Sequence, residues 1–398
     1  MKHTREFLSV TIALCLTFSA LSQKKEIIGY YPSWKWKSRN NLMTPARIPY
    51  DKLTIINYAF FYPLPDGRVV GRDTVGDDIY LQGERDLTTG EHKPETSLMA
   101  LAHRNKVKVV LSLGGWEDSD NFPVVAAGAA SRAHLAHSCI ERIREFGFDG
   151  IDVDWEFPGY AEHKGTPEDK QNFTLLLHTL KDSLTALGVQ SAKSYLLTAA
   201  LPANPGETAS MDIEKVAPIL DQLNIMTYDF SGPWDPISNH NSPLYAPRPE
   251  DSTHNVDAAF KKYHTVYGIP SEKINLGVPF YAHTFSNCTE LHAPHAGSDT
   301  VHFSKDGAFY YDIVTIMDKF TRRWDDRAKA PYLVSTNWNM LVSYDDEESI
   351  RCKAQYVVEN NARGLIIWEI TGDYLPDHRT PLLDAIHDTF YGTNIKHQ

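Results

Sequence analysis

Short apolar runs recur along the chain, and a stretch with helical spacing of apolar positions follows most of them. Runs of this length, rich in Val, Ile, Leu, Tyr and Phe and bounded by turn residues, are typical of strands buried on both faces. The pattern predicts eight such strands, at residues 27–34, 53–62, 107–113, 148–156, 195–201, 223–230, 274–281 and 365–370. An α/β protein with a parallel sheet is therefore expected.

Helical periodicity is clearest in segments that lie between these strands and after the last of them. Apolar residues there return every three or four positions, as on the buried face of a helix. The segments are 132–145, 169–187, 255–267, 347–361 and 381–390. A strand followed by a helix, repeated eight times, predicts a (β/α)8 barrel of the TIM type.

Two intervals are too long to be simple connections between a strand and a helix. Residues 63–98 are polar and turn-rich, and we expect them to cap the barrel mouth. Residues 283–346 lie between the seventh strand and its helix and contain strand-like and helix-like pieces of their own. They predict a small α+β insertion that walls one side of a cleft, within one catalytic barrel that spans residues 23–398.

The first 22 residues combine basic residues with a long apolar run, a pattern that does not recur in the remainder of the chain. Lys2 and Arg5 precede an apolar run of roughly 15 residues, and Ala20 and Ser22 have the spacing of a cleavage site. This pattern predicts a signal peptide over residues 1–22 and a secreted protein, extracellular or periplasmic. The alternative is a membrane anchor, for which the run is too short to span a bilayer comfortably.

Composition narrows the classes of partner. Apolar residues make up 42% of the chain and charged residues 23%, values that are ordinary for a globular protein and exclude wholesale disorder. Acidic residues outnumber basic ones by 51 to 39, which gives a formal charge of -12. Neither nucleic acid nor a membrane surface is therefore expected as the main partner. We expect a monomer that binds a neutral or cationic ligand.

The most informative residues form a row of carboxylates on the predicted fourth strand. Alternate side chains of a strand share one face, so Asp152, Asp154 and Glu156 point the same way, toward the barrel interior and its C-terminal rim. Barrel enzymes carry out their chemistry at that rim. The intervening residues, which would face the helix layer, are Ile151, Val153 and Trp155.

Three neighbouring carboxylates are costly to bury unless protons, hydrogen bonds or a metal compensate. Crowding of like charges should keep at least one proton among them near neutral pH, and a proton that can move to Glu156 makes that residue a candidate general acid. A Mg²⁺ or Ca²⁺ site is the alternative. Alternation along one strand is poor geometry for wrapping an ion, so we expect no metal and no cofactor.

Residues 149–156 read DGIDVDWE and resemble DGxDxDxE, the strand-four signature of the family-18 glycoside hydrolases. Other strand ends are similar to motifs of that family as well. They are GYY at 29–31, NYAF at 57–60, SLGG at 112–115, MTYD at 226–229, GVPFY at 277–281 and Trp368. The likeness extends over about residues 27–370.

The resemblance implies a retaining, substrate-assisted reaction. In that reaction Glu156 protonates the glycosidic oxygen while the substrate's own 2-acetamido oxygen attacks C1 and forms an oxazolinium ion. Asp154 would orient the acetamido N–H, Asp152 would hold a shared proton behind it, and Tyr228 would hydrogen-bond the acetamido oxygen. Asp229 completes the MTYD motif and is included among the expected catalytic residues.

Aromatic side chains supply the expected sugar-binding surface, because the CH faces of sugars pack on aromatic rings. Trp116 and Trp234 follow the third and sixth strands directly, where loops form a cleft, and Trp368 would form its floor. Core packing remains the alternative for each ring. The full expected set of substrate-binding residues is Tyr30, Phe60, Gly115, Trp116, Met226, Trp234, Tyr281 and Trp368.

The sequence departs from the family pattern at two places. Ala282 and His283 stand where chitinases of the family often have Gly-Arg, so a basic contact to substrate is weakened or replaced by His283. Glu369 stands where a small or apolar residue is common.

The resemblance implies a chitinase that cleaves β-1,4-linked N-acetylglucosamine polymers or oligomers. The alternatives are an endo-β-N-acetylglucosaminidase acting on N-glycans or peptidoglycan, and a non-catalytic chitin-binding lectin. Such lectins typically lack the acid that Glu156 provides here.

Overall fold

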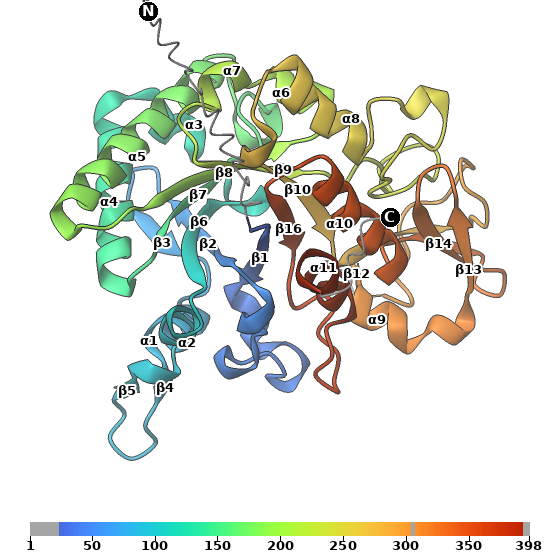
Figure 1. Cartoon of the computed structure of the whole chain (residues 1–398), viewed down its shortest axis with the longest axis horizontal. Coiled ribbons are helices and arrows are strands. Elements are labelled where there is room, and N and C mark those ends of the chain that lie inside the picture. Colours follow the sequence, from blue (N-terminus) through green and yellow to red (C-terminus); the bar gives the residue numbers. More distant parts are fainter. Residues whose placement is uncertain (1–23, 304–306, 393–398) are drawn as a thin grey trace, which may run out of the picture.

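The computed structural model describes residues 24–303 and 307–392, and the proposed signal peptide lies outside this part of the chain. Parallel strands form a closed barrel, because β1 pairs with both β2 and β16. In spatial order the barrel strands are β1 (Glu26–Pro32), β16 (Gly364–Trp368), β10 (Ile274–Pro279), β9 (Gln222–Met226), β8 (Leu196–Pro202), β7 (Gly150–Asp154), β6 (Lys108–Gly114) and β2 (Ile55–Pro63). The predicted (β/α)8 barrel is confirmed (Figure 1).

Helices surround the barrel and supply its outer layer (Figure 1). The longest are α4 (Ala129–Phe146), α5 (Asp169–Ser191), α10 (Glu347–Glu359) and α11 (Pro381–Tyr391). In α4 the buried positions recur with helical spacing, and the helix stops at Gly147, whose φ of 86° suits a left-handed C-cap. The shorter helices are α1 (Thr74–Gln82), α2 (Leu98–Arg104), α3 (Phe122–Ala127), α6 (Pro205–Ala209), α7 (Ile213–Val216), α8 (Val256–Lys261) and α9 (Tyr310–Thr315).

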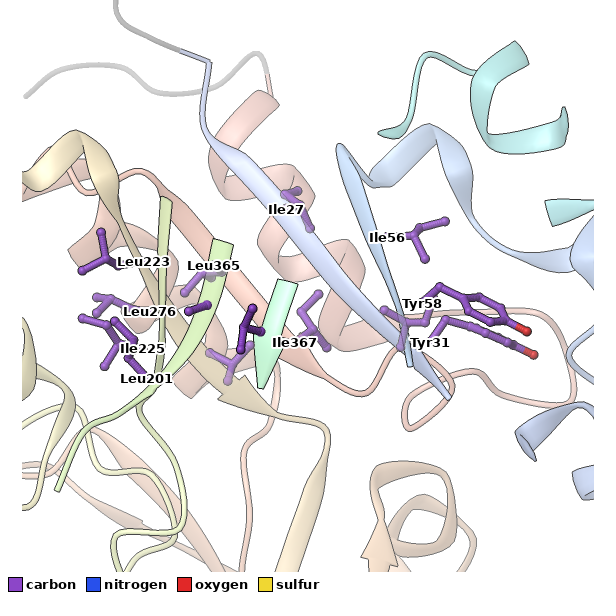
Figure 2. Packing of buried hydrophobic residues seen from close by; sticks show 14 of the residues in the cluster. Ile27, Tyr31, Ile56, Tyr58, Leu201, Leu223, Ile225, Leu276, Leu365 and Ile367 are labelled. Atoms are coloured by element: carbon purple, nitrogen blue, oxygen red, sulfur yellow. The ribbon is translucent and has the colours of Figure 1, made fainter. Parts of the chain in front are cut away.

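The main hydrophobic core lies between the barrel strands and these helices. Figure 2 shows side chains of alternate strand residues in this layer, among them Ile27 and Tyr31 of β1 and Leu365 and Ile367 of β16. The residues between them point inward and form a smaller cluster inside the barrel, to which Tyr30 belongs. The two-residue period of a strand thus separates the packing face from the face that carries chemistry.

An antiparallel sheet is inserted between β10 and α10. It consists of β12 (Ala308–Phe309), β11 (Tyr281–Ser286), β15 (Met340–Ser343), β14 (Ala330–Ser335) and β13 (Thr321–Asp325), in that spatial order. With α9 it lies to one side of the barrel (Figure 1). The sheet begins at Tyr281, two residues before the insertion that the sequence predicts, because β11 follows β10 almost without a break.

The segment after β2 forms β3 (Val69–Gly71), α1, and a hairpin of β4 (Glu84–Arg85) and β5 (His92–Lys93). β3 pairs antiparallel with β2, and the hairpin projects away from the barrel (Figure 1). Within the described chain, Arg72 is the residue of this segment that reaches the cleft, so the expected cap over the barrel mouth is wrong. No helix of the described residues is both long enough and apolar enough to cross a membrane.

Candidate active site

Asp152 lies at the centre of the barrel and is fully buried. Its carboxylate accepts hydrogen bonds from side chains on four different strands, which occupy both of its oxygens. The donors and distances are the Tyr30 hydroxyl at 2.8 Å, the Ser112 hydroxyl at 3.0 Å, the Thr198 hydroxyl at 2.6 Å and the Asn224 amide at 3.0 Å. Burial raises the pKa of Asp152, while these four donors act in the opposite direction by stabilising the charged form.

Asp154 stands next along β7 and is also buried. Its Oδ1 has no hydrogen-bond partner among the described residues. Burial, the charge of Glu156 and the charge of Asp152 together raise the pKa of Asp154 well above the ordinary range of an aspartate. Because Asp152 is surrounded by donors and Asp154 is not, Asp152 is the member of the row best suited to stay ionised, and protons retained by crowding are best placed on Asp154 and Glu156.

Glu156 lies two residues beyond the end of β7, at the cleft. Its main-chain N–H donates to the Ser119 hydroxyl at 2.9 Å, and the main-chain N–H of Trp116 donates to its carboxylate. Burial and the charge of Asp229 raise the pKa of Glu156 to about 8. The side chain therefore carries its proton at neutral pH, as a general acid must.

This pKa leads to a prediction about pH. As the general acid that the resemblance implies, Glu156 must hold a proton, so we expect kcat/KM on a soluble oligosaccharide to fall on the alkaline side with a midpoint near pH 8. The measurement is a profile of kcat/KM between pH 5 and 10, because this ratio reports the pKa of the free enzyme, with stability checked at each pH. An activity that already declines above pH 5 would show that Glu156 has the pKa of an ordinary glutamate.

Gly114 and Gly115, at the end of β6, allow close approaches to the neighbouring strands β7 and β2. Their φ angles are 115° and 87°, a region that suits glycine. A Cβ on Gly114 would lie 2.2 Å from the carbonyl oxygen of Asp154, and one on Gly115 would lie 2.4 Å from the ring of Phe60. Gly115 is thus a packing position and does not line the cleft, contrary to its expected place in the substrate-binding set.

Tyr228 and Asp229 follow the end of β9 and reach the same cleft. Asp229 has a φ of 57°, and its main-chain N–H donates to Oδ1 of Asn241 at 2.8 Å. Its carboxylate accepts hydrogen bonds from the Tyr281 hydroxyl and from Nε2 of His283, both at 2.7 Å. His283, which stands where chitinases of the family often have an arginine, therefore contacts the carboxylate of Asp229 directly.

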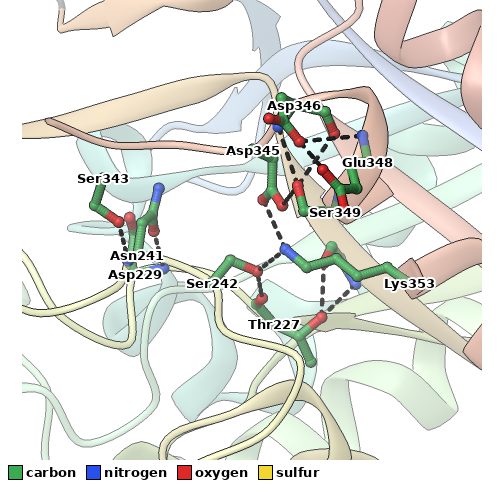
Figure 3. Close-up of polar contacts among 11 residues, drawn as sticks. Thr227, Asp229, Asn241, Ser242, Ser343, Asp345, Asp346, Glu348, Ser349 and Lys353 are labelled. Carbon is green, nitrogen blue, oxygen red and sulfur yellow. Dashed lines mark hydrogen bonds and ion pairs between the residues drawn. The ribbon is translucent and has the colours of Figure 1, made fainter. Parts of the chain in front are cut away.

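A buried polar network joins Lys353, Asp345, Ser242 and Thr227 (Figure 3). The Lys353 ammonium of α10 donates to Asp345 at 2.6 Å and to the Ser242 hydroxyl at 2.7 Å. Ser242 in turn donates to the main-chain oxygen of Thr227 at 2.6 Å. This network ties the end of the insertion to the residue that precedes Tyr228.

Aromatic rings form the wall of a cleft of about 910 Å³. Trp368 stacks on Phe60 with ring centroids 5.6 Å apart and an angle of 16°, and Tyr30 packs against it at 5.6 Å. Of the expected site residues, those that line this cleft are Tyr30, Phe60, Trp116, Asp154, Glu156, Met226, Tyr228, Asp229, Trp234, Tyr281 and Trp368. Asp152 lies beneath it.

Several lining residues were not among those that the sequence predicted. They include Trp34, Arg72, Phe157, Tyr160, Glu207 and Phe309. Trp34 and Phe157 follow barrel strands closely, a position that could have identified them. Glu369 turns away from the cleft instead, and its carboxylate accepts hydrogen bonds from the main-chain N–H and the hydroxyl of Thr371, each at 2.7 Å. No group of metal-ligating side chains suited to an ion occurs among the described residues.

Comparison with known proteins places these features in a family. The model of glycosyl hydrolases family 18 matches residues 26–373. Chitinase A1 of Niallia circulans is 36% identical over 397 residues, which cover 87% of this chain and 56% of that protein. The chain thus spans little more than half the length of that relative.

Solved structures have the same fold. Chitinase ChiA74 from Bacillus thuringiensis superposes with a TM-score of 0.80 at 29% identity, covering 94% of this chain and 71% of that one. A mutant of the Ostrinia furnacalis Group II chitinase catalytic domain 2, in complex with penta-N-acetylchitooctaose, gives a TM-score of 0.81 at 26% identity, with coverage of 92% and 96%.

Proposed function

Because this chain belongs to glycosyl hydrolase family 18, we propose that it hydrolyses β-1,4-linked N-acetylglucosamine polymers or oligomers. The observation that carries the proposal is the row of carboxylates along β7 and just beyond it, which runs from a buried, hydrogen-bonded Asp152 to Glu156 in an aromatic cleft that raises its pKa to about 8. The family relative solved with a chitooligosaccharide supports the substrate class.

We propose that the nucleophile comes from the substrate. Asp154 stands only two residues before Glu156 in the same row and is poorly placed to approach a sugar ring from the opposite face, while Asp229 is held by Tyr281 and His283. In the proposed reaction the acetamido oxygen bonds to C1, the bond from C1 to the glycosidic oxygen breaks, and Glu156 gives its proton to that oxygen. Water then attacks C1 of the oxazolinium ion, the bond from C1 to the acetamido oxygen breaks and restores the acetamido group, Glu156 takes the proton of the water, and the configuration at C1 is retained.

The neighbouring residues fit this sequence of steps. Oδ1 of Asp154 has no hydrogen-bond partner within the described chain. It can therefore accept a hydrogen bond from the acetamido N–H of the substrate. Tyr228 is buried beside Asp154 and Glu156, and burial followed by the charges of those residues raises its pKa, so that its hydroxyl remains a donor. It can donate a hydrogen bond to the acetamido oxygen and so hold that oxygen in position to attack C1.

The test compares tetramers of N-acetylglucosamine and of glucosamine with otherwise identical linkage. We expect the acetylated tetramer to be cleaved and the other to be cleaved slower by several orders of magnitude, because a well-placed intramolecular nucleophile has an effective concentration of about 10⁵ M or more. Equal rates would exclude a substrate-derived nucleophile. A glycoprotein substrate tested in parallel distinguishes chitinase from N-glycan hydrolase, and the absence of any cleavage would favour a lectin.

We further propose that the protein is exported and that residues 1–22 are then removed. Two basic residues followed by an apolar run and small residues support this proposal. The intact mass of the protein recovered outside the cytoplasm is expected to lack this segment. A secreted chain that retains Met1 would contradict cleavage.

A further inference from the structure

His163 lies between two residues that line the cleft, and contacts the main chain of Glu156 and the ring of Trp116. Its Nδ1 is 2.5 Å from the main-chain oxygen of Glu156. Its ring meets that of Trp116 edge-on, with centroids 4.7 Å apart and an angle of 64° between the planes. No motif in the sequence indicated a function for this histidine.

The hydrogen bond defines where His163 carries a proton. A carbonyl oxygen can only accept a hydrogen bond, so Nδ1 of the imidazole must be the donor. The bond therefore holds the peptide group between Glu156 and Phe157. On the other side of that residue, its N–H is held by the Ser119 hydroxyl, which itself donates to the carbonyl of Gly115 at 2.9 Å. Glu156 is fixed from both directions.

Trp116 has little other support. It is 45% exposed, and its ring contacts only His163 and Tyr160 among the aromatic neighbours that the described structure provides. An exposed side chain without such contacts samples several rotamers and loses that freedom when a sugar binds. Because the main-chain N–H of Trp116 also donates to the carboxylate of Glu156, the position of this residue affects the acid as well as the substrate.

The loop that carries His163 is itself well held. The N–H groups of His163 and Gly165 both donate to the carbonyl of Tyr160, at 3.1 and 2.9 Å. The buried carboxylate of Asp169 accepts hydrogen bonds from the N–H groups of Gly159 at 3.2 Å and Thr166 at 2.8 Å. The imidazole is therefore presented by a hydrogen-bonded turn that follows β7.

We infer that His163 is a positioning residue with two separable effects. Its Nδ1–H holds the main chain of Glu156 and so aims the acid at the glycosidic oxygen, and its ring holds Trp116 ready as a sugar-binding surface. The inference rests on the proposed function, in which Glu156 is the acid.

Two substitutions separate the effects. Asn places an amide N–H at the same number of bonds from Cα as Nδ1 but has no ring, so for His163→Asn we expect kcat near the wild-type value and KM for a soluble oligomer raised about 3- to 10-fold. Phe keeps the ring and lacks the donor, so for His163→Phe we expect KM near the wild-type value and kcat lowered about 3- to 10-fold. His163→Ala should show both losses.

The experiment measures kcat and KM for these three variants on one oligomer, together with thermal unfolding. His137, exposed on α4, gives matched control variants His137→Asn and His137→Phe, which should resemble the wild type. Recovery of kcat in His163→Asn relative to His163→Ala supports the inference and does not depend on the Phe variant folding. Equal kcat in the Asn and Ala variants, or all three His163 variants within twofold of wild type, would overturn it. Activity of Glu156→Gln within tenfold of wild type would instead show that Glu156 is not the acid, the part of the proposed function on which this inference rests.

Discussion

The substitution Glu156→Gln is expected to lower kcat by about 10²- to 10⁴-fold, the usual contribution of general acid–base catalysis. Gln has the shape of Glu, and its amide oxygen can still accept the hydrogen bond from the main-chain N–H of Trp116. It has no acidic proton to give to the leaving oxygen. The measurement is kcat on a defined N-acetylglucosamine oligomer, with binding of the same oligomer followed separately.

Binding should survive this substitution, because the aromatic wall of the cleft is unchanged. Glu141→Gln is the matched control, since Glu141 lies half-exposed on α4 in the outer layer and should leave kcat at the wild-type value. Activity of Glu156→Gln within tenfold of wild type would mean that another group donates the proton.

The second large effect concerns stability. Lys353→Met is expected to lower the free energy of unfolding by about 3–5 kcal/mol, the usual cost of removing one partner of a buried ion pair. The side chains of Lys353 and Asp345 are 1% and 2% exposed, and their charged groups are 2.6 Å apart. Without the ammonium, Asp345 must keep a buried negative charge or take up a proton, and Ser242 loses its donor. Urea unfolding of both proteins measures the difference.

An exposed pair of the same chemistry provides the control. Lys261 is paired with Asp257 at 2.8 Å on α8, but its side chain is 65% exposed, so Lys261→Met should cost less than about 1 kcal/mol. The double substitution Lys353→Met with Asp345→Asn should recover part of the loss by removing the unpaired charge. If Lys353→Met and Lys261→Met cost the same, the buried network does not stabilise this region as proposed.

The position of the carboxylate row could be predicted from local sequence because it depends only on the two-residue period of a strand. Alternation along one strand separates Asp152 and Asp154 from Ile151 and Val153, whatever surrounds them. The expected outward direction of Trp155 is confirmed, since its ring stacks on Phe122 at 5.1 Å and meets Phe173 edge-on at 5.9 Å. The strand itself ends at Asp154, two residues earlier than predicted, because Glu156 has left the sheet to face the cleft.

Other features involve residues that are far apart in the sequence. Glu369 stands where the family commonly has a small or apolar residue, and its carboxylate does not line the cleft but accepts hydrogen bonds from Thr371. The donors around Asp152 come from strands up to 122 positions away, and only closure of the barrel brings them together. His163 gave no signal, because a lone histidine in a polar loop has no pattern that distinguishes it.

The sequence alone determined the number and order of the strands, the face on which the carboxylates lie and the family to which their motif points. Hydrophobic periodicity and short motifs carry that information, since both depend on neighbours along the chain. The tertiary structure decided which residues share a charge, a proton or a ring contact. Asp154 without a partner, Glu156 with a pKa of about 8, and His163 between Glu156 and Trp116 all depend on distances between segments that only the folded barrel sets.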